Sequence, residues 1–318
     1  MKVVKKMTSK LAQIKQMISN DTLYSLLQHA AHPIMSLRYL WFMWRAPRPQ
    51  VANTKQTLAY LNQHHLSVAR YGDGEFRWMM NIKNDSFQDT TPELARRLQE
   101  IIKSNQANIM ICLPDVFDGL QQYTRTNAGA WRHILSHYGF KIVKYLQPNK
   151  RYYDANFTRP YIDRRDKVQS EQFFAQIKHL WADRNVLIVE GAATRFGLSN
   201  DFLATARSVR RIICPSTNAF KQYAAILAQT KAIARPDDVI LIALGPTATV
   251  LAYDLAQVGF WALDIGHADV EYDWFQAKAT VRTPLKNKYV NELAAGHTVD
   301  NTNDKQYLQE IVAHIAQT

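Results

Sequence analysis

The chain has 318 residues, of which 47% are hydrophobic and 21% are charged, a composition typical of a globular protein and not of a disordered or fibrous one. Lysine and arginine number 39 and aspartate and glutamate 27, so the net charge of +12 should attract anions such as nucleic acid, acidic lipid or phosphorylated substrates. The sequence has two cysteines without zinc-finger or disulfide spacing, no apolar run near the ~18 residues of a membrane span, and no recognisable signal peptide. These features predict a cytoplasmic protein.

Residues 1–50 are expected to form a basic amphipathic helical arm that precedes a domain of residues 51–318. The first 48 residues contain eight Lys or Arg and one acid, so they carry +7 of the net charge. Apolar residues at helical spacing predict two short helices between residues 10 and 27. The aromatic segment 37–45 then suits either the acidic inner face of a membrane or packing on the domain or on a second subunit, as in a homo-oligomer.

After this arm, short apolar runs alternate with amphipathic stretches. The runs are residues 66–70, 109–113, 186–189, 211–214 and 239–244. Such runs are typical of strands buried on both faces, and stretches such as 92–104 and 219–231 have the pattern of helices. The alternation predicts an α/β fold, with a Rossmann-like, mostly parallel sheet flanked by helices. Polar clusters that follow these runs should converge on one crevice at the carboxyl ends of the strands.

The first polar cluster, Arg70-Tyr-Gly-Asp-Gly-Glu75, places two carboxylates between glycines directly after a strand. Glycine allows a sharp turn and a close approach of a ligand to the backbone. A tight turn with solvated acids is the alternative, but the position at the end of a strand favours a functional role.

The segment 264–274 carries His267, Asp269, Glu271 and Asp273 at every second position. In an extended chain these side chains would share one face. An Asp-x-Glu pair there could hold a divalent cation such as Mg²⁺ or Mn²⁺ together with phosphate oxygens of a substrate. A solvated edge strand is the alternative.

Weaker signals come from four further segments. Residues 244–254 read as a strand, a Gly-Pro turn and a helix start suited to phosphate, and residues 190–197 offer Arg195 to a diphosphate. Segments 156–161 and 286–292 add basic and aromatic groups suited to phosphate, a base or a sugar, although an ordinary loop or helix surface explains each of them better.

Together, these motifs resemble one family, the glycosyltransferases with the GT-D fold, formerly catalogued as DUF1792. The resemblance covers residues 66–292 in the family's motif order. It implies a Rossmann-like domain that transfers a sugar, commonly glucose, from a UDP-sugar to a glycan, glycoprotein or lipid-linked acceptor. It also implies a divalent metal, Mn²⁺ or Mg²⁺, held by an Asp-x-Glu motif.

Two segments have the Asp-x-Glu form. Asp269 and Glu271 are the first choice as metal ligands, because neighbouring polar residues extend their face, and Asp73 and Glu75 would then act as catalytic carboxylates that face the sugar or the acceptor. The resemblance implies that the substrate-binding residues are Arg70, Gly72, Gly74, Arg159, Tyr161, Gly191, Thr194, Arg195, Gly245, Pro246, Thr247, His267, Lys288 and Tyr289.

Two other functions remain open from the sequence. A basic protein that binds membrane or nucleic acid on an α/β scaffold would also carry a positive charge, but that charge is concentrated in the arm while acids gather at the predicted crevice. Nucleic acid is therefore not the expected partner. A nucleotide-sugar hydrolase could use the same metal site, and only acceptor-dependent product would distinguish it from a transferase.

Overall fold

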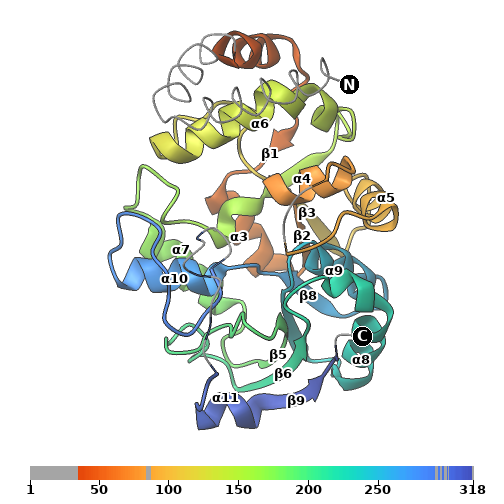
Figure 1. The fold of residues 1–318 in the computed structure, drawn as a ribbon, viewed down its shortest axis with the longest axis vertical. Helices are drawn as coiled ribbons and strands as arrows, with labels where there is room; N and C mark the ends of the chain where they lie inside the picture. The colour runs from red at the N-terminus through yellow and green to blue at the C-terminus, as the bar shows by residue number, and fades with distance from the viewer. Residues whose placement is uncertain are drawn as a thin grey trace, which may run out of the picture.

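In the computed structural model, which describes residues 35–83, 87–290, 293, 296, 299 and 301–316, nine strands form one parallel sheet (Figure 1). The order of strands across the sheet is β1-β4-β3-β2-β8-β7-β5-β6-β9. The strands are β1 (Gln50–Val51), β2 (Ser67–Arg70), β3 (Ile109–Leu113), β4 (Arg151–Asp154), β5 (Asn185–Gly191), β6 (Ser208–Cys214), β7 (Asp238–Ala243), β8 (Trp261–Asp264) and β9 (Ile311–His314). The predicted parallel α/β fold is thus confirmed.

The strand order creates a crevice in the middle of the sheet. The connection that leaves β2 runs toward the β1 edge, and the connection that leaves β5 runs toward the β9 edge. Strands β8 and β7 lie between them. In open α/β sheets, ligands bind outside the carboxyl ends of strands at such a topological switch point.

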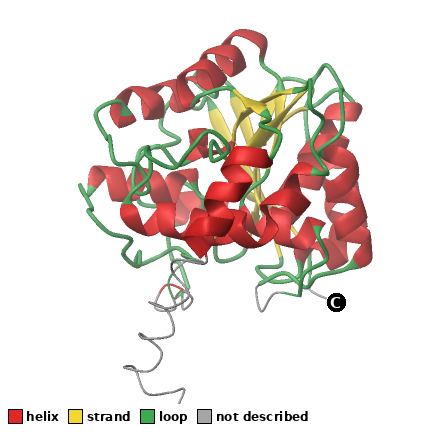
Figure 2. Ribbon diagram, turned by 90° about the horizontal axis from the view of Figure 1, so that it is seen from above, coloured by secondary structure: helices red, strands yellow, loops and turns green. Residues whose placement is uncertain are grey.

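The apolar runs of the sequence form strands that are buried on both faces. In β5, Val186 and Ile188 pack on one side of the sheet, whereas Leu187 and Val189 pack on the other. Alternate side chains of a strand point to opposite faces, so a run without polar residues requires helices on both sides. Figure 2 shows helices on both sides of the yellow sheet.

The helices follow the capping and periodicity rules. In α5, Thr91 caps the first turn by accepting a hydrogen bond from the Leu94 N–H, Pro92 occupies the start, and apolar residues at helical spacing are buried. The α-helices are α3 (Thr54–His64), α4 (Asp73–Met79), α5 (Pro92–Ile101), α6 (Arg125–Val143), α7 (Ser170–His179), α8 (Tyr223–Ile233), α9 (Pro246–Gln257), α10 (Ala268–Gln276) and α11 (Lys305–Glu310). Two 3₁₀ helices are η1 (Ala155–Thr158) and η2 (Ala219–Gln222).

The prediction that segment 264–274 is extended is wrong. Strand β8 ends at Asp264, Gly266 turns the chain with a φ of 52°, and α10 begins at Ala268. The sequence also fits a helix, because Val270 and Trp274 are four residues apart on one apolar face and acids in the first turn stabilise the helix dipole. Asp269 and Glu271 are therefore about 200° apart around a helix and do not share a face.

Part of the predicted arm packs against the body of the protein. Residues 35–45 form a helix that lies beside α6 at one end of the molecule (Figure 1). Phe42 is 2% exposed, and its ring contacts Phe140 edge-on at 5.4 Å. The helices predicted between residues 10 and 27 lie outside the described residues, as do most of the residues that carry the arm's charge.

Candidate active site

A pocket of about 400 Å³ lies at the carboxyl ends of the strands. Its walls come from the segments that follow β2, β5, β6, β7 and β8, and from the helices α4, α6 and η1. The polar clusters of the sequence converge there, as the parallel sheet requires. The predicted site residues that line the pocket are Arg70, Gly72, Asp73, Gly74, Glu75, Arg159, Gly191, Thr194, Gly245, His267 and Tyr289.

The turn from β2 into α4 holds two carboxylates at the pocket wall. Glu75 folds back to accept a hydrogen bond of 2.8 Å from the Gly72 N–H, which fixes the start of α4. Asp73 is exposed in the first turn of the same helix. A Cβ atom on Gly74 would lie 2.7 Å from the Trp78 ring, so only glycine allows this turn to pack so closely. The turn therefore holds Glu75 in place and leaves Asp73 open to a ligand.

A buried ion pair joins β2 to β8 beneath this turn. The Arg70 Nη2 atom lies 2.8 Å from Asp264 Oδ1, and Arg70 Nε donates a 2.8 Å hydrogen bond to the Asp264 carbonyl. Thr249 of α9 donates a further hydrogen bond to the Asp264 carboxylate. Burial raises the pKa of Asp264, while Arg70 opposes this rise. The pair thus fixes the floor of the pocket at the point where distant segments of the chain meet.

Glu75 is partly shielded from solvent and lies near the charges of both Asp264 and Arg70. Burial, followed by the charge of Asp264, raises the pKa of Glu75 to about 7. The hydrogen bond from Gly72 and the charge of Arg70 oppose this rise without cancelling it. A cation bound beside Glu75 would stabilise its ionised form, because an opposite charge favours ionisation.

Two further arginines, Arg159 and Arg282, line the pocket. Arg159 Nη2 lies 3.4 Å from one oxygen of Asp163, and Arg282 Nη2 lies 2.6 Å from the other. All three residues line the pocket. Among the described residues, the lining contains three arginines and four acidic residues, so the protein itself supplies no excess of positive charge there.

Comparison with known proteins identifies the family to which this pocket belongs. A family profile described as "Glycosyltransferase GT-D fold" matches residues 68–293. The chain belongs to this glycosyltransferase family. The resemblance carried by the sequence motifs is thereby confirmed, and residues 68–293 form a glycosyltransferase domain of this family.

Two relatives of this GT-D glycosyltransferase come from streptococci. The chain is 41% identical over 271 residues to the probable glycosyl transferase Gly of Streptococcus gordonii and 35% identical over 267 residues to the glycosyltransferase GlyD of Streptococcus pneumoniae serotype 4. Each alignment covers 84% of this chain but only 39% and 32%, respectively, of the relatives. The chain therefore spans well under half the length of these two proteins.

Solved structures agree with this assignment. One, described as "The highly conserved domain of unknown function 1792 has a distinct glycosyltransferase fold", has a TM-score of 0.82 and 36% identity, with 87% of this chain and all of that chain covered. Another, "A New Glycosyltransferase (DUF1792) from Streptococcus sanguinis", has a TM-score of 0.80 and 41% identity, with 85% of this chain and all of that chain covered. The fold of the enzyme is thus that of the DUF1792 glycosyltransferases.

The predicted metal ligands Asp269 and Glu271 are not among the residues that line the pocket, although Glu271 Oε1 lies 3.4 Å from Nε of the lining residue Arg159. Both side chains are fully buried. Asp269 accepts a hydrogen bond from the Gly197 N–H and lies 2.8 Å from the Lys288 ammonium. Glu271 accepts a hydrogen bond from the Ile162 N–H. These carboxylates join α10 to neighbouring segments of the enzyme, and the structure does not bring the two together.

Five of the predicted substrate-binding residues also lie outside the pocket lining. Lys288 is 2% exposed and forms ion pairs with Asp269 at 2.8 Å and Asp273 at 2.6 Å. Arg195 is buried and donates to the Asn287 carbonyl. The remaining three are the buried residues Tyr161, Pro246 and Thr247. Two cations that were expected to grip a diphosphate are therefore buried within the fold.

Sequence reasoning missed several residues of the pocket wall. Arg282 comes from a loop without a recognisable motif, and Asn127, Trp131 and Ile134 come from α6. The helical spacing of these three residues shows that they share a face, but only the folded chain shows that this face borders the pocket.

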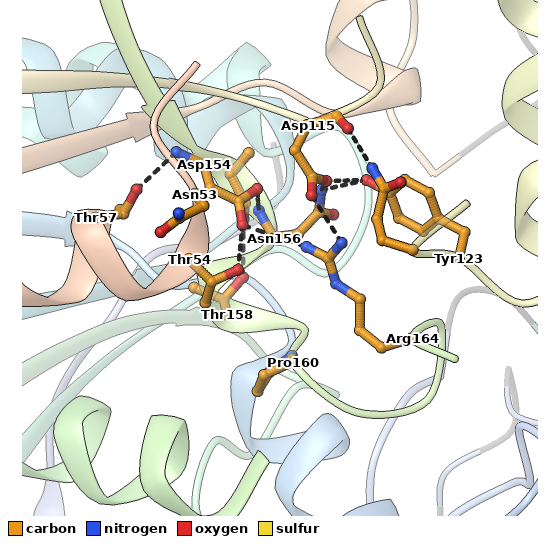
Figure 3. A network of polar contacts seen from close by, with 12 residues as sticks. Asn53, Thr54, Thr57, Asp115, Tyr123, Asp154, Asn156, Thr158, Pro160 and Arg164 are labelled. Atoms are coloured by element: carbon orange, nitrogen blue, oxygen red, sulfur yellow. Dashed lines mark hydrogen bonds and ion pairs between the residues drawn. The ribbon is translucent and has the colours of Figure 1, made fainter. Parts of the chain in front are cut away.

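A polar network behind the pocket positions one more wall residue, Asn156 of η1 (Figure 3). Its amide donates hydrogen bonds to Asp115 at 3.1 Å and to the Tyr123 hydroxyl at 2.8 Å. Arg164 lies between Asp115, at 2.8 Å, and the buried Asp154, at 3.3 Å. Burial and the charge of Asp115 raise the pKa of Asp154 to about 7. The network anchors η1, which leads directly to Arg159 at the pocket.

Proposed function

We propose that this glycosyltransferase moves a sugar, with glucose as the first candidate, from a UDP-sugar to a hydroxyl group of a glycan, glycoprotein or lipid-linked acceptor. The reaction would depend on Mn²⁺ or Mg²⁺. The observation that carries this proposal is the Asp-x-Glu pair, Asp73 and Glu75, at the wall of a pocket that arginines also line.

Charge in the pocket supports the use of a divalent cation. Four acids and three arginines line it, and a diphosphate would add further negative charge. No group of three or more His, Cys, Asp or Glu side chains suited to a metal occurs in the described part of the chain. Mg²⁺ and Mn²⁺ at nucleotide sites need only one or two carboxylates, because phosphate oxygens and water complete the coordination. The pocket residues fit such a cation.

Asp73 and Glu75 are the better candidates to hold this cation. Asp73 is exposed at the pocket, and Glu75 has a raised pKa that a cation would lower. By contrast, Asp269 and Glu271 are fully buried and make contacts with other segments. We therefore exchange the two expected roles and assign the metal to the pair that follows β2.

Other residues of the pocket wall are suited to bind the sugar donor and the acceptor. When bound, the cation would neutralise charge that develops on the departing UDP. Arg159 and Arg282 would bind the diphosphate and hold it in place as the bond to the sugar breaks. The α6 face that carries Asn127 and Trp131 would bind the acceptor, since an aromatic ring and an amide suit the apolar and hydroxyl faces of a sugar. Catalysis would then depend mainly on positioning and charge neutralisation.

Calorimetric titration of UDP, with Mn²⁺ and with EDTA, tests the metal assignment. We expect tighter binding with Mn²⁺, and a loss of most of this metal effect in Asp73→Asn and Glu75→Gln. Asp269→Asn is the comparison variant, since it removes the same charge from the other Asp-x-Glu segment; because it also breaks the buried ion pair with Lys288, thermal unfolding must first show that it is folded at the titration temperature. Equal UDP affinity with Mn²⁺ and EDTA would refute the metal-bridged site, and a metal effect lost only in Asp269→Asn would restore the first assignment.

Release of UDP from a panel of nucleotide sugars tests the reaction itself. We expect UDP-glucose to be turned over with Mn²⁺ and the rate to increase when glycan, glycopeptide or lipid-linked acceptors are added. Sugar release that is independent of every acceptor would instead favour a nucleotide-sugar hydrolase.

A further inference from the structure

The helix of residues 35–45 presents an apolar stripe to solvent. Leu37, Leu40, Trp41 and Trp44 are 67%, 61%, 56% and 76% exposed. Their spacing of three, four and seven residues places them on one face of the helix. The helix packs on α6 through Phe42 and through one side of the Trp41 ring, whose centre lies 4.5 Å from that of Phe140. The helix is therefore held in place while each of the four stripe residues stays more than half exposed.

This stripe is unusual for the surface of the enzyme. Nine large hydrophobic side chains are strongly exposed among the described residues, and four of them lie within this one segment. Single exposed hydrophobic residues are common on soluble proteins, but a contiguous cluster marks an interaction surface.

Positive charge surrounds the stripe. Arg38 and Arg45 are exposed, and no acidic residue occurs between positions 35 and 50. Arg48 is also exposed, but it pairs with the exposed Asp118 at 3.6 Å. The guanidinium of Arg45 lies 5.2 Å from the centre of the Trp44 ring. The supporting helix α6 also contains no acid, and its Lys141 is exposed. The surface therefore combines exposed tryptophan and leucine with a cationic border.

We propose that this stripe docks on a membrane surface that contains anionic lipid. Tryptophan and arginine together suit the boundary between headgroups and acyl chains, where the ring is partly buried and the guanidinium pairs with phosphate. Among the described helices, none is long and apolar enough to cross a membrane, so the stripe would lie in the plane of the interface. The arginines select an acidic membrane over a neutral one, because each basic residue near an anionic surface adds to the attraction.

Flotation of the full chain with vesicles tests the proposal. We expect binding to vesicles of phosphatidylcholine with phosphatidylglycerol, and weak binding to phosphatidylcholine alone. The double variant Leu40→Gln/Trp44→Gln should lower the partition coefficient by on the order of tenfold or more, since two apolar side chains no longer enter the interface. The control variant Val168→Gln/Val258→Gln removes two exposed apolar side chains elsewhere and should bind as the unmodified chain does.

A second pair of variants tests the role of charge. Arg38→Gln/Arg45→Gln should lower binding to the anionic vesicles by on the order of tenfold, whereas Lys55→Gln/Lys231→Gln, with the same change in net charge, should not. Thermal unfolding of each variant shows whether it remains folded.

Two results would overturn the proposal. One is vesicle binding by Leu40→Gln/Trp44→Gln that equals that of the unmodified chain, since another part of the chain would then bind the lipid. The other is a dimer of the unmodified chain in light scattering that becomes a monomer in this variant, without vesicle binding by either. The stripe would then contact a second copy of the enzyme.

Discussion

Replacement of Lys288 by methionine should destabilise the fold and leave UDP affinity unchanged, whereas replacement of Arg282 by methionine should lower UDP affinity and leave the fold stable. Lys288 is 2% exposed and lies within 2.8 Å of two carboxylates, those of Asp269 and Asp273. Burial alone would lower the pKa of Lys288, but these two acids raise it, so the side chain stays charged. Lys288→Met would leave the fully buried Asp269 without its cation.

The expected cost of this change is large. Removal of one partner from a buried ion pair destabilises a protein by about 3–5 kcal/mol, because the remaining charge has no compensation. Arg282 differs, since its side chain is 32% exposed and its ion pair with Asp163 is partly solvated. Exposed pairs contribute about 0–1 kcal/mol, so Arg282→Met should leave the free energy of unfolding nearly unchanged.

For UDP binding, Arg282→Met should have the larger effect. A hydrogen bond to a charged group contributes about 1.5–3 kcal/mol, so loss of Arg282 should weaken UDP binding by on the order of ten- to a hundredfold. Lys288→Met should keep the UDP affinity of the unmodified enzyme at temperatures where it remains folded. Urea denaturation measures the free energy of unfolding of each variant, and calorimetry with Mn²⁺ measures its UDP affinity.

Two results would contradict the roles assigned to Lys288 and Arg282. If Lys288→Met has the stability of the unmodified enzyme but loses UDP affinity, Lys288 contacts the nucleotide and the ion pairs with α10 do not stabilise the fold. Unchanged UDP affinity in Arg282→Met would remove Arg282 from the diphosphate site.

Two further predictions concern the floor and the back of the pocket. Gly266→Ala should destabilise the enzyme by about 1–3 kcal/mol in urea denaturation, because φ is positive at this position and the new Cβ would clash with Arg70 Nη2. Gly129→Ala is the matched control. It lies in a helix with open space around the new Cβ and should not destabilise the enzyme. The raised pKa of Asp154, about 7, means that the folded state binds a proton which the unfolded state has released between pH ~4 and 7. The stability that Asp154 contributes is therefore present at low pH and lost as the pH rises through 7. Between pH ~4 and 7, the free energy of unfolding should fall by up to about 1.4 kcal/mol per pH unit. The difference in unfolding free energy between the unmodified enzyme and Asp154→Asn should accordingly be smaller at pH 8 than at pH 5, and a constant difference would contradict the assignment.

The sequence predicted the sheet well where strands are apolar on both faces. The runs that became β2, β3, β5, β6 and β7 contain almost no polar residues, and burial between two helix layers requires such composition. Strand β4 escaped prediction because it reads Arg-Tyr-Tyr-Asp and has no apolar run, and β8, which reads Trp-Ala-Leu-Asp, was not predicted either. Their pairing with longer neighbours, which is a long-range contact, determines their conformation.

The pocket could be predicted only in part for a similar reason. Parallel strands bring their carboxyl ends together, so Asp73, Gly191 and Gly245 were expected at one crevice, and they line it. Lys288 and Arg195 follow motifs just as suggestive, but contacts with distant segments bury both. A sequence motif shows which residues could bind a ligand. Only the folded structure shows whether such a residue instead forms contacts within the protein.

Helix α6 connects the two surfaces for which we propose a role. One side of it carries Trp131 at the pocket, while Gly139 and Phe140 on another side contact Phe42 of the exposed helix. An α-helix is about 10 Å wide, and both α6 and the helix of residues 35–45 lie between the stripe and the pocket, so a membrane that binds the stripe would lie roughly 20 Å from the wall assigned to the acceptor. Among the three acceptor classes, this arrangement favours the lipid-linked one, provided that the headgroup between lipid and sugar spans about two helix widths. A lipid-linked acceptor requires both the membrane contact and the UDP site, which vesicle binding and UDP binding test separately.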